Sequence, residues 1–227
     1  MPPRVVSLVP SVTETLLAWA IRPVACTRFC EQPDLPHVGG TKDPDLAAIT
    51  DLAPDLVVVD KEENRREDHD ALVAAGLAVH VLAVRDLTGL DAEMTGLAAA
   101  VGASWEPLGV ATDPVATRRA WVPIWKRPWM ALGEPTYGSA VLRALGVANV
   151  AAAEGAYPEV DPHAAHAAGA DLVVAPSEPY PFAERHRTEL EQIAPVVFVD
   201  GKDLFWWGAR TPDAVTRLGA ALAVVRP

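Results

Sequence analysis

The sequence predicts an α/β protein with two lobes, each built on a mostly parallel sheet with flanking helices, and a helical connector between them. One supporting observation is an internal echo: residues 46–60 and 163–176 each place a short amphipathic helix before an Asp-Leu-Val-Val strand. The other is the alternation of short apolar strands with helices along the chain, which is typical of βαβ units. Two lobes of one design also leave a gap that suits a ligand.

Length and composition agree with this organisation. The chain has 227 residues, of which half are hydrophobic and 22% are charged, so a packed core is feasible. Lobes of about 100 residues each are within the usual range for domains. We expect the amino-terminal lobe at residues 1–85, the connector at 86–119 and the carboxy-terminal lobe at 120–227.

In the first lobe, apolar runs predict strands at 5–9, 24–27, 56–59 and 77–82. Helices are expected from 10 to 20, over 45–52, and from the charged stretch 61–70 to Gly76. Ser11 and Glu14 have the spacing of a capping box and therefore mark the expected start of the first helix. Residues 29–44 form a loop that contains proline and glycine.

The connector and second lobe continue the alternation. A helix is predicted over 90–101, and Pro107 and Pro114 prevent it from continuing unbroken through Arg119. Strands are expected at 121–125, after Asp171, and at 196–199. Helices are predicted over 138–145, 182–193 and 212–225, and Gly146 is expected to cap the end of the first of them.

The charge pattern excludes several classes of partner. The formal net charge is −11, and the basic residues form no cluster larger than Arg65-Arg66, so we expect neither nucleic acid nor an anionic membrane as a partner. No apolar stretch reaches the length of a membrane span, and no signal peptide is recognisable. The chain as given is therefore expected in the cytoplasm, or in the periplasm or at the cell surface if a leader has been removed. We expect a monomer.

Signals for catalysis and for a resident metal are weak. The motifs of nucleophilic hydrolases, P-loop proteins, dinucleotide-binding proteins and zinc peptidases do not occur. His163 and His166 are spaced as residues on one helix surface. Cys26 and Cys30 lack the second ligand pair of a zinc site and are interpreted as ordinary thiols. We expect no enzymatic activity, no metal centre and no intrinsic cofactor.

Aromatic residues are the stronger signal for a ligand. Most lie next to predicted strand ends or prolines in loops: Phe29, Trp125, Trp129, Tyr157, Tyr180 and the run Phe205-Trp206-Trp207. Such side chains offer flat apolar walls with a polar edge, which suit a large planar ligand. Covering of the sheet ends is the alternative for any single one of them, but three adjacent aromatic residues cannot all point into a core.

Acidic residues form the second candidate surface. Glu62 and Glu178 each lie seven residues beyond the aspartate of the echoed motif, and Glu63 adjoins the first of them. Acids at matched positions of two lobes can dock a two-fold symmetric partner through arginine pockets. For the charged stretch that contains Glu62 and Glu63, a solvated face is the alternative.

Several segments of the chain resemble one family of proteins. They are Val6-Ser-Leu-Val-Pro-Ser-Val-Thr-Glu14, Pro54-Asp-Leu-Val57, Glu63-Asn-Arg65, Arg127-Pro-Trp-Met130, Tyr157-Pro-Glu-Val160 and Ser177-Glu-Pro-Tyr-Pro-Phe182. Between residues 4 and 224 the sequence is similar to the class III solute-binding proteins, the helical-backbone metal receptors, and most of all to the vitamin B12-binding branch of ABC importers. The resemblance implies that two α/β lobes hold a cobalamin or another metal chelate between them.

The resemblance also implies roles for individual residues. Phe29 stands where B12 binders place an aromatic residue against the corrin, and Asp203 keeps an acid of the ligand-holding loop. Trp207 replaces the arginine of that loop, and Arg210 is the nearest substitute. Together with the aromatic analysis this gives as candidate ligand-binding residues Phe29, Gln32, Trp125, Trp129, Tyr137, Asp203, Phe205, Trp206, Trp207 and Arg210. Glu62, Glu63 and Glu178 match the acids that dock an importer permease dimer.

Five readings of the ligand and function stay open. The first is a non-enzymatic corrinoid receptor. The second is a haem-binding protein. Haem iron requires an axial Tyr, His or Met ligand, and the candidates for this ligand are Tyr137, Tyr157 and His37. The third is a ferric-siderophore-binding protein, which would need arginines that converge on the ligand, and few arginines lie in the predicted loops. The others are an enzyme acting on a metal cofactor and an interaction protein that binds its partner through the acids alone.

Overall fold

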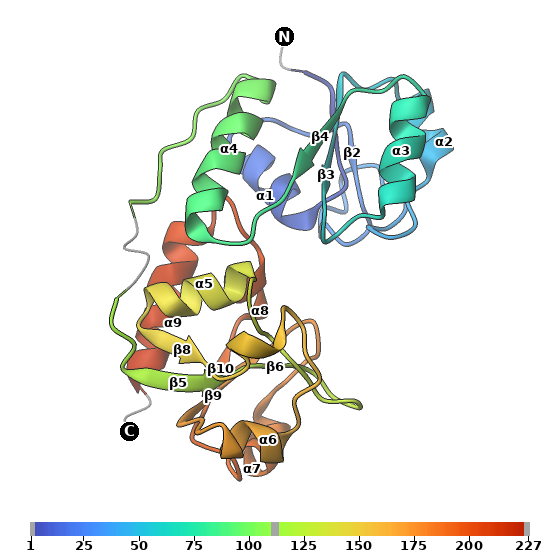
Figure 1. Cartoon of the computed structure of the whole chain (residues 1–227). Helices are drawn as coiled ribbons and strands as arrows, with labels where there is room; N and C mark the ends of the chain where they lie inside the picture. Colours follow the sequence, from blue (N-terminus) through green and yellow to red (C-terminus); the bar gives the residue numbers. More distant parts are fainter. Residues whose placement is uncertain (1–2, 110–113, 225–227) are drawn as a thin grey trace. The chain divides into compact units, whose positions relative to one another are not determined.

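A computed structural model describes residues 3–109 and 114–224 of the chain, which divide into two compact units (Figure 1). Unit 1 consists of Met1–Val84, Gly89–Pro107 and Trp207–Arg210. Unit 2 consists of Arg85–Thr88, Leu108–Trp206 and Thr211–Pro227. The segment expected as a connector is thus divided, because most of its helix belongs to unit 1.

Unit 1 has a four-stranded parallel sheet in the order β2-β1-β3-β4. Its strands are β1 (Val5–Ser7), β2 (Ala25–Cys26), β3 (Leu56–Asp60) and β4 (Val79–Leu82). The helices are α1 (Pro10–Ala18), α2 (Leu46–Asp51), α3 (Arg66–Ala74) and α4 (Leu87–Val101). The apolar side of α2 and α3 packs on the sheet, with Ile49, Val57 and Leu72 buried in the core.

Unit 2 has a second four-stranded parallel sheet, in the order β10-β9-β5-β8. Its strands are β5 (Arg118–Trp121), β8 (Val147–Asn149), β9 (Leu172–Pro176) and β10 (Val196–Val199), and an antiparallel pair joins β6 (Pro123–Trp125) to β7 (Met130–Ala131). Its helices are α5 (Tyr137–Ala144), α6 (Pro162–Ala167), α7 (Arg187–Leu190), α8 (Gly201–Phe205) and α9 (Thr211–Val224), and two 3-10 turns cover Ala152–Glu154 and Glu184–His186.

The two sheets repeat one topology, because β2-β1-β3-β4 corresponds strand for strand to β8-β5-β9-β10. The echoed sequence supplies the helix and central strand of each copy, α2–β3 and α6–β9. Asp45 caps α2 by accepting the Ala48 N–H at 3.0 Å, and Asp161 caps α6 by accepting the Ala164 N–H at 2.8 Å. The predicted α/β fold with two parallel-sheet lobes is confirmed.

The aspartate that precedes each echoed strand also has one role in both units. Asp55 accepts the backbone N–H of Arg4, just before β1, at 2.7 Å. Asp171 accepts the backbone N–H of Arg119, in β5, at 3.1 Å. Each carboxylate therefore ties the start of one parallel strand to its neighbour, which explains why the motif recurs.

Several local predictions are wrong. Helix α1 begins at Pro10, and Val9 stands at its cap position without a side-chain cap, so Ser11 and Glu14 form no capping box. Proline at the first helical position explains this start, because its φ is preset and no N–H is lost. Residues 122–125 do not continue β5, because the chain leaves that strand after Trp121 and forms the pair with β7.

The helix expected over 182–193 is reduced to the second 3-10 turn and the four residues of α7. The apolar residues of this segment, among them Leu190 and Ile193, belong to a buried cluster that also contains Trp121 and Phe182. Phe182 itself lies before the helical turns. In the connector, α4 ends at Val101, where the predicted helix 90–101 also ends. Within 3–109 and 114–224, no helix is both long and apolar enough to cross a membrane.

Candidate functional site

In each unit several of the candidate residues lie in the segments that follow the parallel strands. All strands of a parallel sheet end at the same side, and open α/β sheets bind ligands beyond that side. We call this side the carboxyl edge of each unit. In unit 1 it consists of the loops after β1, β2 and β3, and in unit 2 of the loops after β9 and β10 and the β6–β7 hairpin beyond β5.

A buried amide organises the carboxyl edge of unit 1. Asn64 Oδ1 accepts the Asp60 N–H at 2.9 Å, and Asn64 Nδ2 donates to the carbonyls of Leu8 at 3.2 Å and Thr41 at 2.9 Å. One side chain therefore holds together the ends of β1 and β3 and the loop that follows β2. This explains the Glu-Asn-Arg motif in the sequence as a structural element.

Asp60, the last residue of β3, shapes the loop that carries the candidate docking acids. Its Oδ1 accepts the backbone N–H groups of Glu62 at 2.8 Å and Glu63 at 3.2 Å. Its Oδ2 is buried and, among the described residues, has no hydrogen-bond partner. Burial raises the pKa of Asp60 to about 6, although the two backbone donors act in the opposite direction.

Phe29 is the exposed aromatic residue of this edge. It lies three residues after β2, and 51% of its surface is accessible. The Arg28 guanidinium lies over its ring at 4.8 Å from the centroid and is itself paired with Asp43 at 2.9 Å. Gln32 follows in the same loop, where its backbone oxygen lies 3.1 Å from His37 Nε2. The loop thus presents an exposed aromatic ring with a guanidinium over one of its faces.

An aromatic cluster occupies the carboxyl edge of unit 2. Its members are Trp121, Trp125, Trp129, Tyr180, Phe182 and His186. Trp129 stacks on Phe182 with centroids 6.0 Å apart and lies 5.4 Å from the buried Trp121. Trp125 is the outer member, 45% exposed and edge-on to Tyr180 at 5.7 Å. Trp129 therefore belongs to the packing, whereas Trp125 offers surface to a ligand.

The three aromatic residues after β10 differ in their environments. Phe205 closes helix α8, so the run does not lie wholly in a loop as predicted. Trp206 is half-buried with Lys202 Nζ at 4.9 Å from its ring centroid. Trp207 is only 6% exposed, which leaves Phe205 and Trp206 as the more accessible members.

Asp203, Arg210 and Tyr137 are engaged with partners that the sequence did not suggest. Asp203 is buried and accepts two bonds of 2.7 Å from Arg217, and Arg210 donates to Glu14 at 2.7 and 3.1 Å. The Tyr137 hydroxyl lies 2.9 Å from the Thr211 hydroxyl, and its ring is 6% exposed. The structure thus gives these three residues stabilising contacts, and their ligand roles stay predictions.

The candidate docking acids stand at corresponding positions of the two units, Glu62 after β3 and Glu178 after β9. Glu62 and Glu63 are exposed, and Lys42 Nζ donates to the Glu62 carbonyl at 2.5 Å. Glu178 is half-buried against Gly201, where an added Cβ would come within 2.3 Å of the Glu178 side chain. Both loops are therefore held by local contacts.

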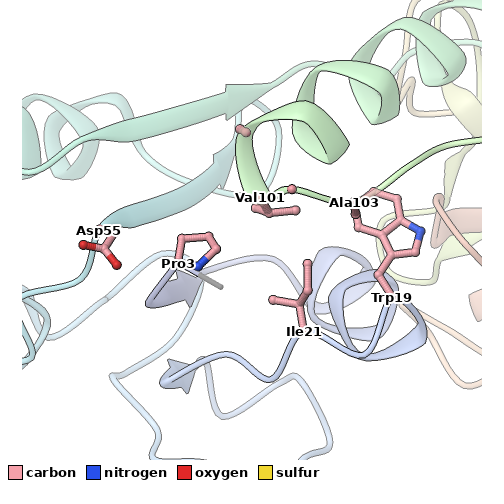
Figure 2. Close-up of a pocket in the computed structure, with 8 residues that line it drawn as sticks. Pro3, Trp19, Ile21, Asp55, Val101 and Ala103 are labelled. Atoms are coloured by element: carbon pink, nitrogen blue, oxygen red, sulfur yellow. The ribbon is translucent and has the colours of Figure 1, made fainter. Parts of the chain in front are cut away.

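A pocket of about 590 Å³ in unit 1 lies away from the carboxyl edge (Figure 2). Its lining includes Pro3 and Asp55, which precede strands β1 and β3, and Trp19, Val101 and Ala103. Asp55 is the charged residue of the lining, and one of its carboxylate oxygens accepts the Arg4 N–H. Over the described residues, no group of three or more His, Cys, Asp or Glu side chains is placed to hold a metal ion.

Comparison with protein-family models and with curated protein sequences gives no match. Solved structures do match. The periplasmic haem-binding protein BhuT, in complex with two haems, superposes with a TM-score of 0.81, 23% identity and 98% coverage of each chain. The periplasmic vitamin B12 binding protein BtuF of Vibrio cholerae superposes with a TM-score of 0.78, 19% identity and 98% coverage of each chain.

The periplasmic haem binding protein HutB of Vibrio cholerae gives a TM-score of 0.78 at 19% identity, over 96% of this chain and 98% of that one. The chain therefore has the class III solute-binding fold that the sequence motifs predicted, over nearly its whole length.

Proposed function

We propose that the chain is a non-enzymatic solute-binding protein for a planar metal tetrapyrrole, a corrinoid or haem, which it presents to an ABC importer. One observation carries the proposal. Each unit exposes an aromatic side chain at its carboxyl edge, Phe29 at 51% and Trp125 at 45%, within a fold that solved binders of both chelates share. An exposed ring at this position suits a flat ligand.

The aromatic contacts supply most of the expected affinity. Burial of apolar surface stabilises a complex by about 25 cal/mol per Å², so a few hundred Å² contributes several kcal/mol before ordering costs. Phe29 already packs against Arg28 at 4.8 Å from its ring centroid, and Trp125 against Tyr180 with centroids 5.7 Å apart, and these contacts reduce the entropy that the two rings lose on binding. Trp206, held by Lys202, is the third aromatic contact of the proposal.

The two chelates differ in whether the protein must supply an axial ligand to the metal. Haem bound through its iron needs an axial side chain, and the Tyr137 hydroxyl is engaged with Thr211. Tyr157, 43% exposed, and the exposed His37 are the remaining candidates. A corrinoid that keeps its own axial ligands needs none from the protein. We therefore place the corrinoid first and haem second.

The binding test is a titration of the purified protein with cyanocobalamin and, separately, with haemin, followed by visible absorption and tryptophan fluorescence. We expect saturable quenching with one chelate, weakened at least tenfold in Phe29→Ala and in Trp125→Leu, as loss of about 1.4 kcal/mol requires. Trp19→Leu, at the pocket of Figure 2, is the matched control and should bind normally. If neither chelate binds at tens of micromolar, the tetrapyrrole proposal fails.

The axial ligand gives a second readout. If haemin binds, Tyr157→Phe or His37→Ala should shift its Soret band while the titration of a corrinoid is unchanged. If neither variant shifts the band, haem is held without these residues and the axial assignment is wrong.

The proposed importer partner is recognised through Glu62, Glu63 and Glu178. Reversal of all three charges to Lys should abolish capture by membranes that contain the permease and leave chelate binding unchanged. Glu67→Lys, an exposed acid on α3, is the matched control. Capture that survives the triple reversal would remove these acids from docking.

A further inference from the structure

The two cysteines lie in contact at the carboxyl edge of unit 1. Cys26 is the last residue of β2, and Cys30 lies four positions later in the loop that carries Phe29. Both are free thiols, 0% and 3% exposed, and they pack together with Leu35. The two side chains therefore share one buried cluster. The sequence interpretation of two ordinary thiols did not anticipate this pairing.

The surroundings of the two sulphur atoms are unequal. Thr13 Oγ1 and Thr27 Oγ1 each lie 3.2 Å from Cys30 Sγ. The Thr27 hydroxyl oxygen also accepts the Phe29 N–H at 3.3 Å, which ties it to the same loop. The neighbouring Cys26 thiol and these hydroxyls lower the pKa of Cys30, whereas the neighbouring Cys30 and burial raise the pKa of Cys26. Cys30 is therefore the sulphur that ionises first.

We propose that Cys26 and Cys30 form an oxidisable dithiol site, in which Cys30 reacts with hydrogen peroxide and Cys26 closes the disulfide. In the first step the Cys30 sulphur attacks the peroxide O–O bond and becomes a sulfenic acid, and the leaving oxygen departs as water with the thiol proton. In the second step the Cys26 sulphur displaces the hydroxyl of the sulfenic acid as a second water. Two thiols are oxidised and one peroxide is reduced to two waters.

The backbone of the loop is arranged for this closure. The Cys30 N–H donates to the Thr27 carbonyl at 3.1 Å, so residues 27–30 already form a turn that brings the two side chains together. The disulfide would enclose Thr27, Arg28 and Phe29 in one small ring. If the proposed function holds, oxidation thus fixes the loop that presents Phe29 to the chelate, but disulfide formation itself needs no ligand.

The test uses the folded, ligand-free protein and hydrogen peroxide. Intact-mass analysis should show the loss of two hydrogen atoms, and peptide mapping should join residues 26 and 30. Dimedone should trap a sulfenic acid in Cys26→Ser and none in Cys30→Ser. Thr27→Val should slow the peroxide reaction several-fold, whereas Thr95→Val, whose hydroxyl bonds its own helix at Asp91, should not.

Other outcomes overturn the proposal. Unchanged mass after oxidation of a reference dithiol under the same conditions would show that the pair does not react. Equal dimedone labelling of Cys26→Ser and Cys30→Ser would remove the assigned roles, and a linkage found only between two molecules would replace the internal site. None of these outcomes depends on whether cobalamin or haem binds.

Discussion

The carboxyl edges of the two units belong to sheets of identical strand order, yet they are built from different interactions. In unit 1 a buried amide and a buried carboxylate hold the loops, and Phe29 stands alone as an exposed ring. In unit 2 stacked aromatic rings hold the loops, and Trp125 is only the outermost of them. The opposite strand ends share one contact in both units, made by Asp55 and Asp171, so the difference between the units lies at their carboxyl edges.

The largest effect that tests this contrast is expected within the aromatic cluster. Trp129→Ala should lower the free energy of unfolding by about 3 kcal/mol, because its ring packs on Phe182 and Trp121. Trp125→Ala, at the exposed end, should cost about 1 kcal/mol. Urea denaturation measures both. Equal losses would mean that the cluster has no division between an inner packed part and an outer accessible part.

The corresponding test in unit 1 removes the buried amide. Asn64→Ala leaves the Leu8 and Thr41 carbonyls and the Asp60 N–H without their partner. We expect a loss of about 2–3 kcal/mol, since buried unpaired groups cost about 1–3 kcal/mol. Arg66→Ala, whose side chain is 92% exposed, is the control. A loss as small as that of the control would show that the polar network is not what holds this edge.

The two edges should also differ in their response to pH, through Asp60. Burial raises the pKa of Asp60 to about 6, so the folded state binds a proton more tightly than the unfolded state does. The stability contributed by the protonated form is present below the unfolded pKa and is lost as pH rises to about 6. Between pH 4 and pH 7 the wild type should lose about 2 kcal/mol relative to Asp60→Asn. Parallel stability curves would contradict the assignment.

The sequence predicted the strands with clear apolar runs well and the irregular elements poorly. Strands β3 and β10 lie where the apolar runs placed them, because a strand buried in a parallel sheet is apolar on both faces. The two residues of β7 form a strand too short for the apolar pattern to predict. The apolar spacing of 182–193 suggested a helix, but Phe182 serves the aromatic cluster and not a helix face.

The same limit applies to the candidate site. The pattern identified Phe29 and Trp125, which the structure exposes at the carboxyl edges. It gave no sign that Arg210 pairs with Glu14, 196 positions away, or that Asp203 pairs with Arg217. Ion pairs between residues far apart in the chain leave no periodic pattern in a single sequence. Arg210 and Asp203 were therefore chosen as ligand-binding candidates by their position alone, and the structure places both in ion pairs.

The smallest effects test the part of the comparison in which the units agree. Asp45→Ala and Asp161→Ala remove matched helix caps, with side chains 3.0 and 2.8 Å from the N–H groups that they accept. Each should lower the free energy of unfolding by about 1 kcal/mol, and Asn at either position should restore most of it. A clear difference between the two losses would mean that the units share a backbone topology but not the energetics of the repeated motif. If the two cap variants lose the same stability while the variants at the two carboxyl edges differ in effect, the units differ energetically in their loops and not in the repeated helix and strand.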